Sequence, residues 1–360
     1  MPMQSNKISF KGENVYVGID VHLKQWHVCV RSSFLSPKPF SQPPSARLLH
    51  AYLTRMFPDA VYHSAYEVGF SGFSAHFELL DCGINNIVFN PADICDSQKE
   101  RARKSDAVDC TKICRNLQQG TLRAIHIPAR DALDDRALLR GRKMLVKERA
   151  RTKQRIKSLL YLQGVAYPED FADNRSHWSR RFIMWLEGVF EEPDSGCATQ
   201  MAILLRNLRF INVELLSLDR QIAGLIRRKH SRTDTLLRSI PGIGALTSAK
   251  LALIIGDINR FDTTDSLAGY VGLVPDIRSS ADKETVLGIT FRGHRVLRSA
   301  LIESSWRAIA LDPALGKAFS DYRQRGMHPN KAIVRIARKL VNRIYHVLKK
   351  GVQYEPGVVR

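Results

Sequence analysis

The sequence has no uninterrupted apolar run long enough to cross a bilayer, and it has no lipidation motif. Its opening residues, MPMQSNKISFKGEN, lack the apolar core of a secretory signal. The six cysteines form no CxxC pair and no metal-ligand cluster with His. We therefore expect a cytoplasmic protein with no membrane partner. Its cysteines are expected to be buried free thiols, with Cys110 and Cys114 on one helical face, and a metal or disulfide role is the alternative.

Acidic residues are also in short supply. The chain has 35 Asp and Glu against 55 Lys and Arg, which gives a formal net charge of +20 over 360 residues. An excess of this size favours an anionic partner, most simply the phosphates of DNA or RNA, because counterion release then supplies affinity.

Hydrophobic periodicity divides the chain into three expected domains. Residues 12–128 contain short β-branched strands at 15–32, 60–69 and 85–91 that alternate with helical stretches, which is typical of an α/β layer. Residues 129–232 contain two long amphipathic helices that could form an antiparallel coiled coil, with an insertion near 165–200. Residues 233–350 are mainly helical and end in a basic helix.

Four acids are candidates for metal chemistry. Asp20 and Glu67 end predicted strands, where ligands collect in α/β domains, and Asp106 and Asp109 are spaced to share a helical face. Carboxylates are the ligands that Mg²⁺ prefers, and a two-metal site could serve phosphoryl transfer. The alternative is that Asp106 and Asp109 pair with neighbouring basic residues on a solvated face. His22, His27, His63 and His346 show no ligand spacing.

Four phrases, YVGIDVHLKQWHV, YEVGFSG, FNP and RKSDAVD, resemble the DEDD-type transposases of bacterial insertion sequences. More narrowly, they are similar to the insertion-sequence "one-ten" family, whose members include bridge-RNA-guided recombinases. The resemblance implies a RuvC-like domain of ribonuclease-H fold that binds Mg²⁺ through Asp20, Glu67, Asp106 and Asp109. One departure falls at Glu67, which is followed by Val-Gly-Phe where the family has Ala-Thr-Gly.

The phrase PGIG at 241–244 resembles a helix-hairpin-helix turn. In such a turn, glycines such as Gly242 and Gly244 let backbone N–H groups approach a phosphate. A tight interhelical turn without a ligand is the alternative.

The stretch LAGYVGLVPDIRSSADKETVLGITFRGHRVLRSAL, from residue 267, resembles the C-terminal transposase domain of the same family. In that domain a serine shortly after the proline is the nucleophile, which by spacing implies Ser280, with Ser279 as its rival. The family commonly has Gly after this serine, whereas this chain has Ala281. Without the resemblance, a Ser-Ser pair in a polar loop is an ordinary turn.

Runs of cationic residues complete the candidate nucleic-acid surfaces, although any one run can be only a solvated face. The candidates are Lys104, Arg140, Arg142, Lys143, Lys147, Arg149, Arg151, Lys153, Arg292, His294, Arg295, Arg298, Lys331, Arg335, Arg338 and Lys339.

We therefore expect a DNA transposase that acts through a phosphoserine intermediate. The resemblance further implies donor and target DNA as substrates, a structured guide RNA as partner, and a homo-oligomer, dimer or tetramer, that builds a composite site. The alternatives are a hydrolytic junction nuclease of RuvC type and a non-enzymatic nucleic-acid scaffold.

Overall fold

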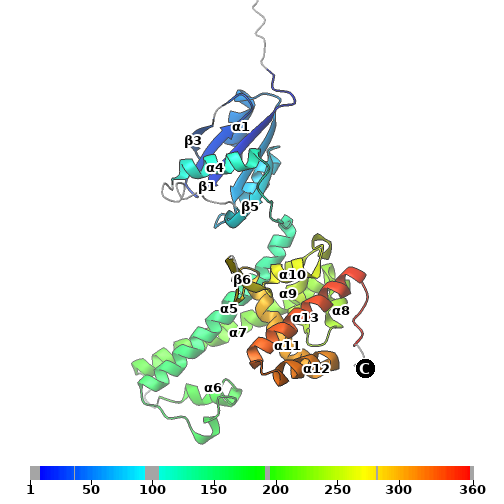
Figure 1. Cartoon of the computed structure of the whole chain (residues 1–360). Coiled ribbons are helices and arrows are strands. Elements are labelled where there is room, and N and C mark those ends of the chain that lie inside the picture. The colour runs from blue at the N-terminus through cyan, green and yellow to red at the C-terminus, as the bar shows by residue number, and fades with distance from the viewer. Residues whose placement is uncertain (1–8, 36, 94–104, 191–194, 281–282, 357–360) are drawn as a thin grey trace, which may run out of the picture. The chain divides into compact units, whose positions relative to one another are not determined.

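The computed structural model describes residues 9–35, 37–93, 105–190, 195–280 and 283–356, with the backbone alone for 277–280 and 283–287 (Figure 1). The chain divides into two compact units, Met1–Ile127 and Pro128–Arg360. Among the described residues, no helix is long and apolar enough to span a membrane.

The N-terminal unit is built on a five-stranded mixed sheet. Its strands are β1 (Asn14–Val21), β2 (Trp26–Arg31), β3 (Lys38–Gln42), β4 (Val61–Glu67) and β5 (Asn85–Phe89). They lie in the order β3-β2-β1-β4-β5, with β1, β4 and β5 parallel and the β1–β2 and β2–β3 pairs antiparallel. The sheet thus has a parallel half whose strand ends meet at one edge.

Helices cover both faces of this sheet (Figure 1). Alternate residues of β1, including Val15, Val17 and Ile19, are fully buried in one core together with side chains of α1 (Ala46–Met56) and α2 (Ser74–Asp81). The intervening residues face α4 (Asp106–Gln118), which lies across the opposite face. A short 3₁₀ helix, Pro91–Asp93, follows β5.

The second unit begins with two long helices that pack side by side, α5 (Arg130–Leu162) and α7 (Gly196–Lys229) (Figure 1). Near the start of α5, Asp135 bonds Lys229, and further along α5, Arg142 bonds Asp219. The second contact lies later in α5 but earlier in α7 than the first. The two helices are therefore antiparallel, as the sequence predicted. In the sequence, a 3₁₀ helix (Glu169–Phe171) and α6 (Arg180–Glu187) come between α5 and α7. They pack with residues of both long helices in a separate small core.

The rest of this unit is a helical cluster around one hydrophobic core. It comprises α8 (Ser231–Arg238), α9 (Ala245–Ile255), a 3₁₀ helix (Ile258–Arg260), α10 (Thr264–Val271), α11 (Arg295–Leu311), α12 (Pro313–Gln324) and α13 (Pro329–Lys350). An antiparallel ribbon, β6 (Pro275–Ser280) and β7 (Lys283–Ile289), interrupts the helices. The sequence predicted the helices but read the serine segment as a polar loop, whereas it lies on a strand.

Candidate active site

Strand alternation directs three polar residues toward α4. On β1, Tyr16 packs beside the α4 cysteines and Gly18 abuts the α4 backbone, so Asp20 continues the same face. On β2, Cys29 belongs to that cluster, so His27, two residues earlier, lies on the same face of the sheet. On β4, Ala65 packs with Ile113 of α4, so Glu67, two residues later, lies on that face as well.

The sheet register brings the strand ends together. β1 and β4 are parallel neighbours, and their last paired residues are Ile19 and Tyr66. Asp20 and Glu67 each come one residue later, so they stand at the same level of adjacent strands. Asp106 and Asp109 occupy the first turn of α4, where the positive end of the helix dipole favours acids. Three separate segments therefore contribute the four predicted acids to one face of the sheet.

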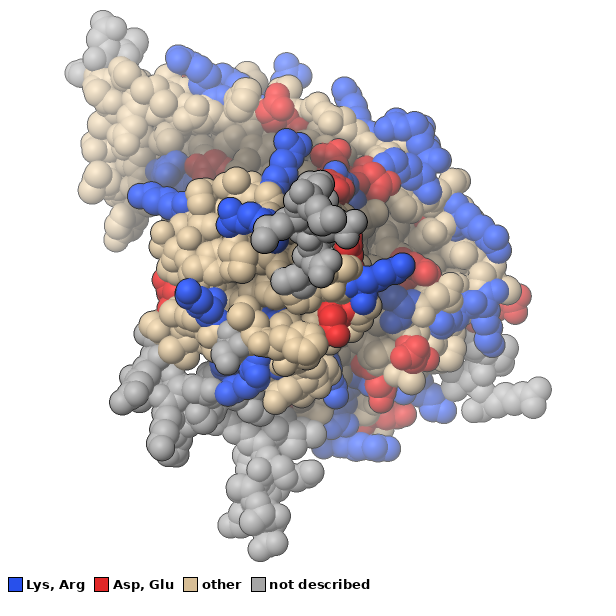
Figure 2. All heavy atoms as spheres, turned by 90° about the horizontal axis from the view of Figure 1, so that it is seen from above, with Lys and Arg blue, Asp and Glu red and all other residues tan. Residues whose placement is uncertain are grey.

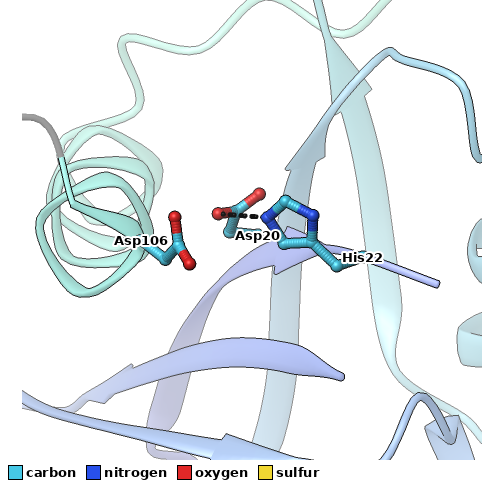
Figure 3. A group of neighbouring side chains, drawn as sticks. All are labelled: Asp20, His22 and Asp106. Atoms are coloured by element: carbon cyan, nitrogen blue, oxygen red, sulfur yellow. Dashed lines mark hydrogen bonds and ion pairs between the residues drawn. The ribbon is translucent and has the colours of Figure 1, made fainter. Parts of the chain in front are cut away.

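Two of these acids form a close group with an imidazole. Donor atoms of Asp20, His22 and Asp106 all lie within 4.8 Å of one another, and the His22 ring is bonded to Asp20, Nε2 to Oδ2, at 3.1 Å (Figure 3). Among the described residues, Glu67 and Asp109 are not members of this group. The structure thus brings Asp20 and Asp106 together, and the metal role of Glu67 and Asp109 stays a prediction.

The expectation that His22 lacks ligand spacing was wrong, whereas His27 is not a member of the group. His22 belongs to the group above, and His27 contacts Asp106, Nε2 to Oδ2, at 3.1 Å. The other ring nitrogen of His27, Nδ1, lies 3.0 Å from the Ser41 hydroxyl on β3. With the hydrogen on Nε2, His27 donates to Asp106 and Nδ1 accepts from Ser41, and Nε2 also lies 2.9 Å from the side-chain nitrogen of Gln25. The missing signal was the hairpin register, because His27 pairs directly opposite Asp20 and His22 follows it by two residues.

The donor set fits a divalent cation. Asp20 and Asp106 offer carboxylate oxygens, which suit hard ions such as Mg²⁺ and Mn²⁺, and His22 adds a nitrogen that transition metals accept. All three side chains keep solvent access, with exposed fractions of 25% for Asp20, 45% for His22 and 53% for Asp106. His27 supports Asp106 as an outer partner, the arrangement that commonly orients metal ligands.

Close packing fixes the position of α4. A Cβ at Gly18 would overlap the Cys110 carbonyl oxygen and the Cys114 nitrogen, so only glycine allows the helix to lie this near to β1. The described cysteines are free thiols, and Cys29, Cys110 and Cys114 are buried beneath the site, as the sequence predicted. Cys95 lies outside the described residues.

The predicted nucleophile belongs to the other unit, on the β6–β7 ribbon. Ser279 pairs with Glu284 and Ser280 with Lys283. At the base of the ribbon, the Thr290 N–H donates to the Val274 carbonyl at 3.0 Å. Two glycines with positive φ, Gly272 and Gly293, then approach too closely for a side chain at either position. The two glycine phrases in the sequence thus anchor the ribbon against the start of α11.

The glycines of PGIG differ in their surroundings. Gly242 has a φ of +86°, and a Cβ there would overlap the Ser304 carbonyl of α11. Packing between helices therefore accounts for Gly242 without a ligand. Gly244 is the N-cap of α9 and is exposed, and a Cβ added there would meet no atom within 4 Å. It therefore keeps the open approach expected of a phosphate-binding turn.

Several predicted nucleic-acid contacts already have partners within the protein. Arg142 bonds Asp219 at 2.5 Å, and Arg338 bonds Asp265 at 2.5 Å. Arg298 donates to the Arg292 carbonyl, Arg140 to the Leu133 carbonyl, and Arg151 to Glu148, while Lys153 lies over the Trp178 ring and Arg335 over the Tyr322 ring. Burial lowers the pKa of His294, which makes it a poor cation at neutral pH.

Other predicted cations have no salt bridge with any acid in the described parts of the chain: Lys143, Lys147, Arg149, Arg292, Arg295, Lys331 and Lys339. Lys104 lies outside the described residues. Figure 2 shows Lys and Arg spread over one face of the molecule with Asp and Glu among them. The binding role of each predicted residue stays a prediction.

Comparison with known proteins finds transposase families in both units of this chain. Residues 17–163 match the DEDD transposase profile of IS110 elements, and residues 234–320 match the profile "Transposase IS116/IS110/IS902 family". Between them the two matches take in well over half of the chain, which belongs to the IS110 family of transposases.

Relatives agree with this assignment. The chain is 28% identical to the transposase for insertion sequence element IS1111A of Coxiella burnetii over 71% of its length, and 32% identical to the pilin gene-inverting protein of Moraxella lacunata over 42%. The matched part spans 70% of the Coxiella protein and 48% of the Moraxella protein, and it spans 60% of a Sinorhizobium fredii relative that is 26% identical.

Proposed function

We propose that this protein cuts and rejoins DNA through a transient phosphoserine bond, with a RuvC-like N-terminal unit that binds Mg²⁺. The observation that carries the proposal is the group formed by Asp20 and Asp106 inside the segment that matches the DEDD transposase profile. The sheet order β3-β2-β1-β4-β5, with an antiparallel hairpin joined to a parallel half, supports the ribonuclease-H fold.

The acids hold the metal in this proposal. Asp20 and Asp106 form the core of the site, Glu67 completes it from the neighbouring strand, and Asp109 does so from the first turn of α4. A divalent cation held by these residues would polarise a phosphate oxygen and would offset the charge that develops during phosphoryl transfer. His27 keeps the Asp106 carboxylate in place through its 3.1 Å contact.

Ser280 supplies the nucleophile. Its hydroxyl gives up a proton as Oγ attacks a backbone phosphorus, a Ser O–P bond forms, the P–O bond to a deoxyribose breaks, and the leaving sugar oxygen takes up a proton. In the reverse sense, a sugar hydroxyl from another strand end attacks the phosphoserine and releases the serine. Because the phosphoserine bond conserves the energy of the broken phosphodiester bond, the strands are rejoined without an external energy source, as recombination requires.

The protein reads backbone and the guide RNA reads sequence in this proposal. Base pairing between a structured RNA and both donor and target DNA supplies sequence choice, and a chain at +20 supplies phosphate contacts. Ser280 and the acids belong to different units, so we propose that a homo-oligomer assembles the composite site. The name of the Moraxella relative, a gene-inverting protein, supports site-specific recombination rather than simple cleavage.

A covalent-complex assay tests this mechanism. The full-length protein is incubated with cognate DNA, co-purified RNA and Mg²⁺, then resolved on a denaturing gel that retains only covalent protein–DNA complexes. We expect a complex with the wild type and with Ser279→Ala, and none with Ser280→Ala.

Cleavage in the same reactions separates the alternatives. Cutting by Ser280→Ala, with no covalent complex in the wild type, would establish hydrolysis by water. Unchanged activity in Asp106→Asn would exclude a metal-dependent role for the acidic group. Treatment of the preparation with ribonuclease should abolish recombination, and persistence of recombination would refute RNA guidance.

A further inference from the structure

A cationic cleft of about 340 Å³ lies between three helices of the C-terminal unit. Arg142 and Lys143 line it from α5, Lys250 from α9 and Arg295 from α11, and Glu303 is an acid in its lining. The sequence indicated Arg142 and Lys143 in one basic run and Arg295 in another, but it offered no reason to group the two runs and did not indicate Lys250. The fold therefore assembles a positive site from three segments that are separate in the sequence.

Three of the four cations lack an anionic partner. Asp219 neutralises Arg142 from outside the cleft, at 2.5 Å. Lys143, Lys250 and Arg295 form no salt bridge with any acid among the described residues, Glu303 included. The cleft thus retains a net positive charge, because Glu303 is the single acid among its lining residues.

Lys250 is the most informative member, because it is half-buried. Burial lowers the pKa of its ammonium group, and the nearby Arg142 lowers it further. A solvated face would hold its cations in water at little cost, whereas a desolvated lysine without a counter-ion destabilises the free protein. In its burial Lys250 therefore differs from the exposed Lys143 and Arg295 of the same cleft.

Neutral groups in the cleft suit an oxyanion. Thr247 and Ser299 line it and carry hydroxyl donors. Arg295 is the first residue of α11, a helix of 17 residues, so the positive end of that helix dipole lies at the cleft. The positive field extends to His294, whose pKa is lowered by burial first and then by Arg136 and Lys143.

We propose that the cleft defined by Lys143, Lys250 and Arg295 binds a backbone phosphate of nucleic acid. A phosphodiester supplies the missing negative charge and accepts hydrogen bonds from the ammonium, guanidinium and hydroxyl groups together. The proposal rests on the proposed function, because it takes nucleic acid as the partner, and it names the place of one contact. DNA and the guide RNA offer the same phosphate chemistry, so the experiment uses each as a separate probe.

Binding in the absence of catalysis tests the cleft. The full-length protein is titrated, in the presence of EDTA, into fluorescein-labelled duplex DNA and, separately, into labelled co-purified RNA at a series of salt concentrations. Lys250→Met keeps most of the side-chain volume and removes the charge. We expect its dissociation constant for one of the two probes to rise about tenfold and the slope of log Kobs against log salt to shrink by about 1.

Lys317→Met on the exposed face of α12 is the matched control, since it removes one positive charge outside the cleft. If Lys250→Met and Lys317→Met behave alike with both probes, the proposal is wrong. Without nucleic acid, we expect Lys250→Met to melt at a higher temperature than the wild type, because an unpaired desolvated charge is gone. Weaker binding together with a lower melting temperature would indicate a structural role and overturn the proposal.

A second variant guards against misfolding. Arg295→Gln, at an exposed position, should shrink the same salt slope for the same probe, and an unchanged slope would contradict the proposal. Because these measurements involve no strand cleavage, failure of the phosphoserine mechanism would leave their outcome unaffected.

Discussion

At the scale of single residues, each acid in the central group has an imidazole as partner. Asp20 is bonded by His22 and Asp106 by His27, both at 3.1 Å. The two histidines differ in their role. His22 is exposed and offers a metal donor, whereas His27 is largely buried and connects Asp106 to Ser41. His27 is thus a positioning residue whose effect passes through the carboxylate that it holds.

The role of His27 predicts weaker metal binding when it is removed. In His27→Ala, the Asp106 carboxylate loses its hydrogen-bond donor, and we expect the dissociation constant for Mn²⁺ to rise at least about tenfold in calorimetric titration. His63→Ala is the control, because His63 bonds Asn14 at the other end of the parallel strands. Equal Mn²⁺ affinities in both variants would show that His27 has no part in the metal site.

The thiols under the site predict selective alkylation. Burial raises the pKa of Cys110 to about 12, so almost none of it is thiolate at pH 8. The pKa of Cys29 is lowered to about 7 by a hydrogen bond from Cys114, yet its sulfur is shielded from reagent. We expect iodoacetamide to modify the half-buried Cys82 and Cys197 in native protein, and Cys29 and Cys110 only after unfolding, as read by peptide mass spectrometry. Rapid native labelling of Cys110 would mean that α4 detaches readily.

At the scale of elements, strongly patterned segments were predictable from the sequence. The strands around Asp20, Glu67 and Asn85, and the long helices α5, α7 and α13, have clear apolar periodicity and form as expected. Strand β3, KPFSQ, lacks alternation and contains proline, and β6, PDIRSS, is mostly polar, so neither was foreseen. Strand β7, KETVLGI, was not foreseen either, although it contains Val286, Leu287 and Ile289. Pairing partners supply the stability of these strands.

Some residues of the candidate site were likewise predictable from the sequence, and others were not. Motif order was enough to indicate Asp20 and Asp106, because each follows a local signal in the chain. His22, His27 and Lys250 were missed since their importance depends on the hairpin register and on helix packing, which one sequence without its fold does not reveal.

The close packing of α4 against Gly18 predicts that one substitution lowers both the stability of the protein and its affinity for metal. In Gly18→Ala the added methyl group would overlap α4 backbone atoms, which forces the helix and Asp106 away from β1. We expect a destabilisation of about 1–3 kcal/mol in denaturant unfolding, together with weaker Mn²⁺ binding. Gly69→Ala is the matched control in the same unit, because a Cβ there meets no atom within 4 Å. Wild-type stability in Gly18→Ala would refute the close approach.

At the scale of the whole molecule, the positive charge and the acidic group belong to different residues and can be altered separately. The acids proposed to hold the metal are few and lie on one face of the N-terminal sheet, while cations are spread along the chain and over the surface (Figure 2). A net charge of +20 favours the binding of polyanions whether or not the metal group is intact.

This separation predicts a binding-competent but inactive variant. We expect DNA affinity to fall by about a thousandfold or more between about 50 and 200 mM salt, as for proteins with six or more phosphate contacts. Asp106→Asn should show the same steep slope, measured by fluorescence anisotropy, while it loses strand cleavage. A marked drop in its affinity at all salt concentrations would show instead that metal and DNA binding are inseparable.

Gly18 also bears on how this protein can vary over generations. Any single-nucleotide change of a glycine codon is silent, introduces a larger amino acid, or stops translation. Since every larger amino acid brings the Cβ for which α4 leaves no room, each surviving missense mutation at this codon would disturb the acidic group from beneath. Purifying selection in an active insertion element should therefore act on a position that never touches the substrate.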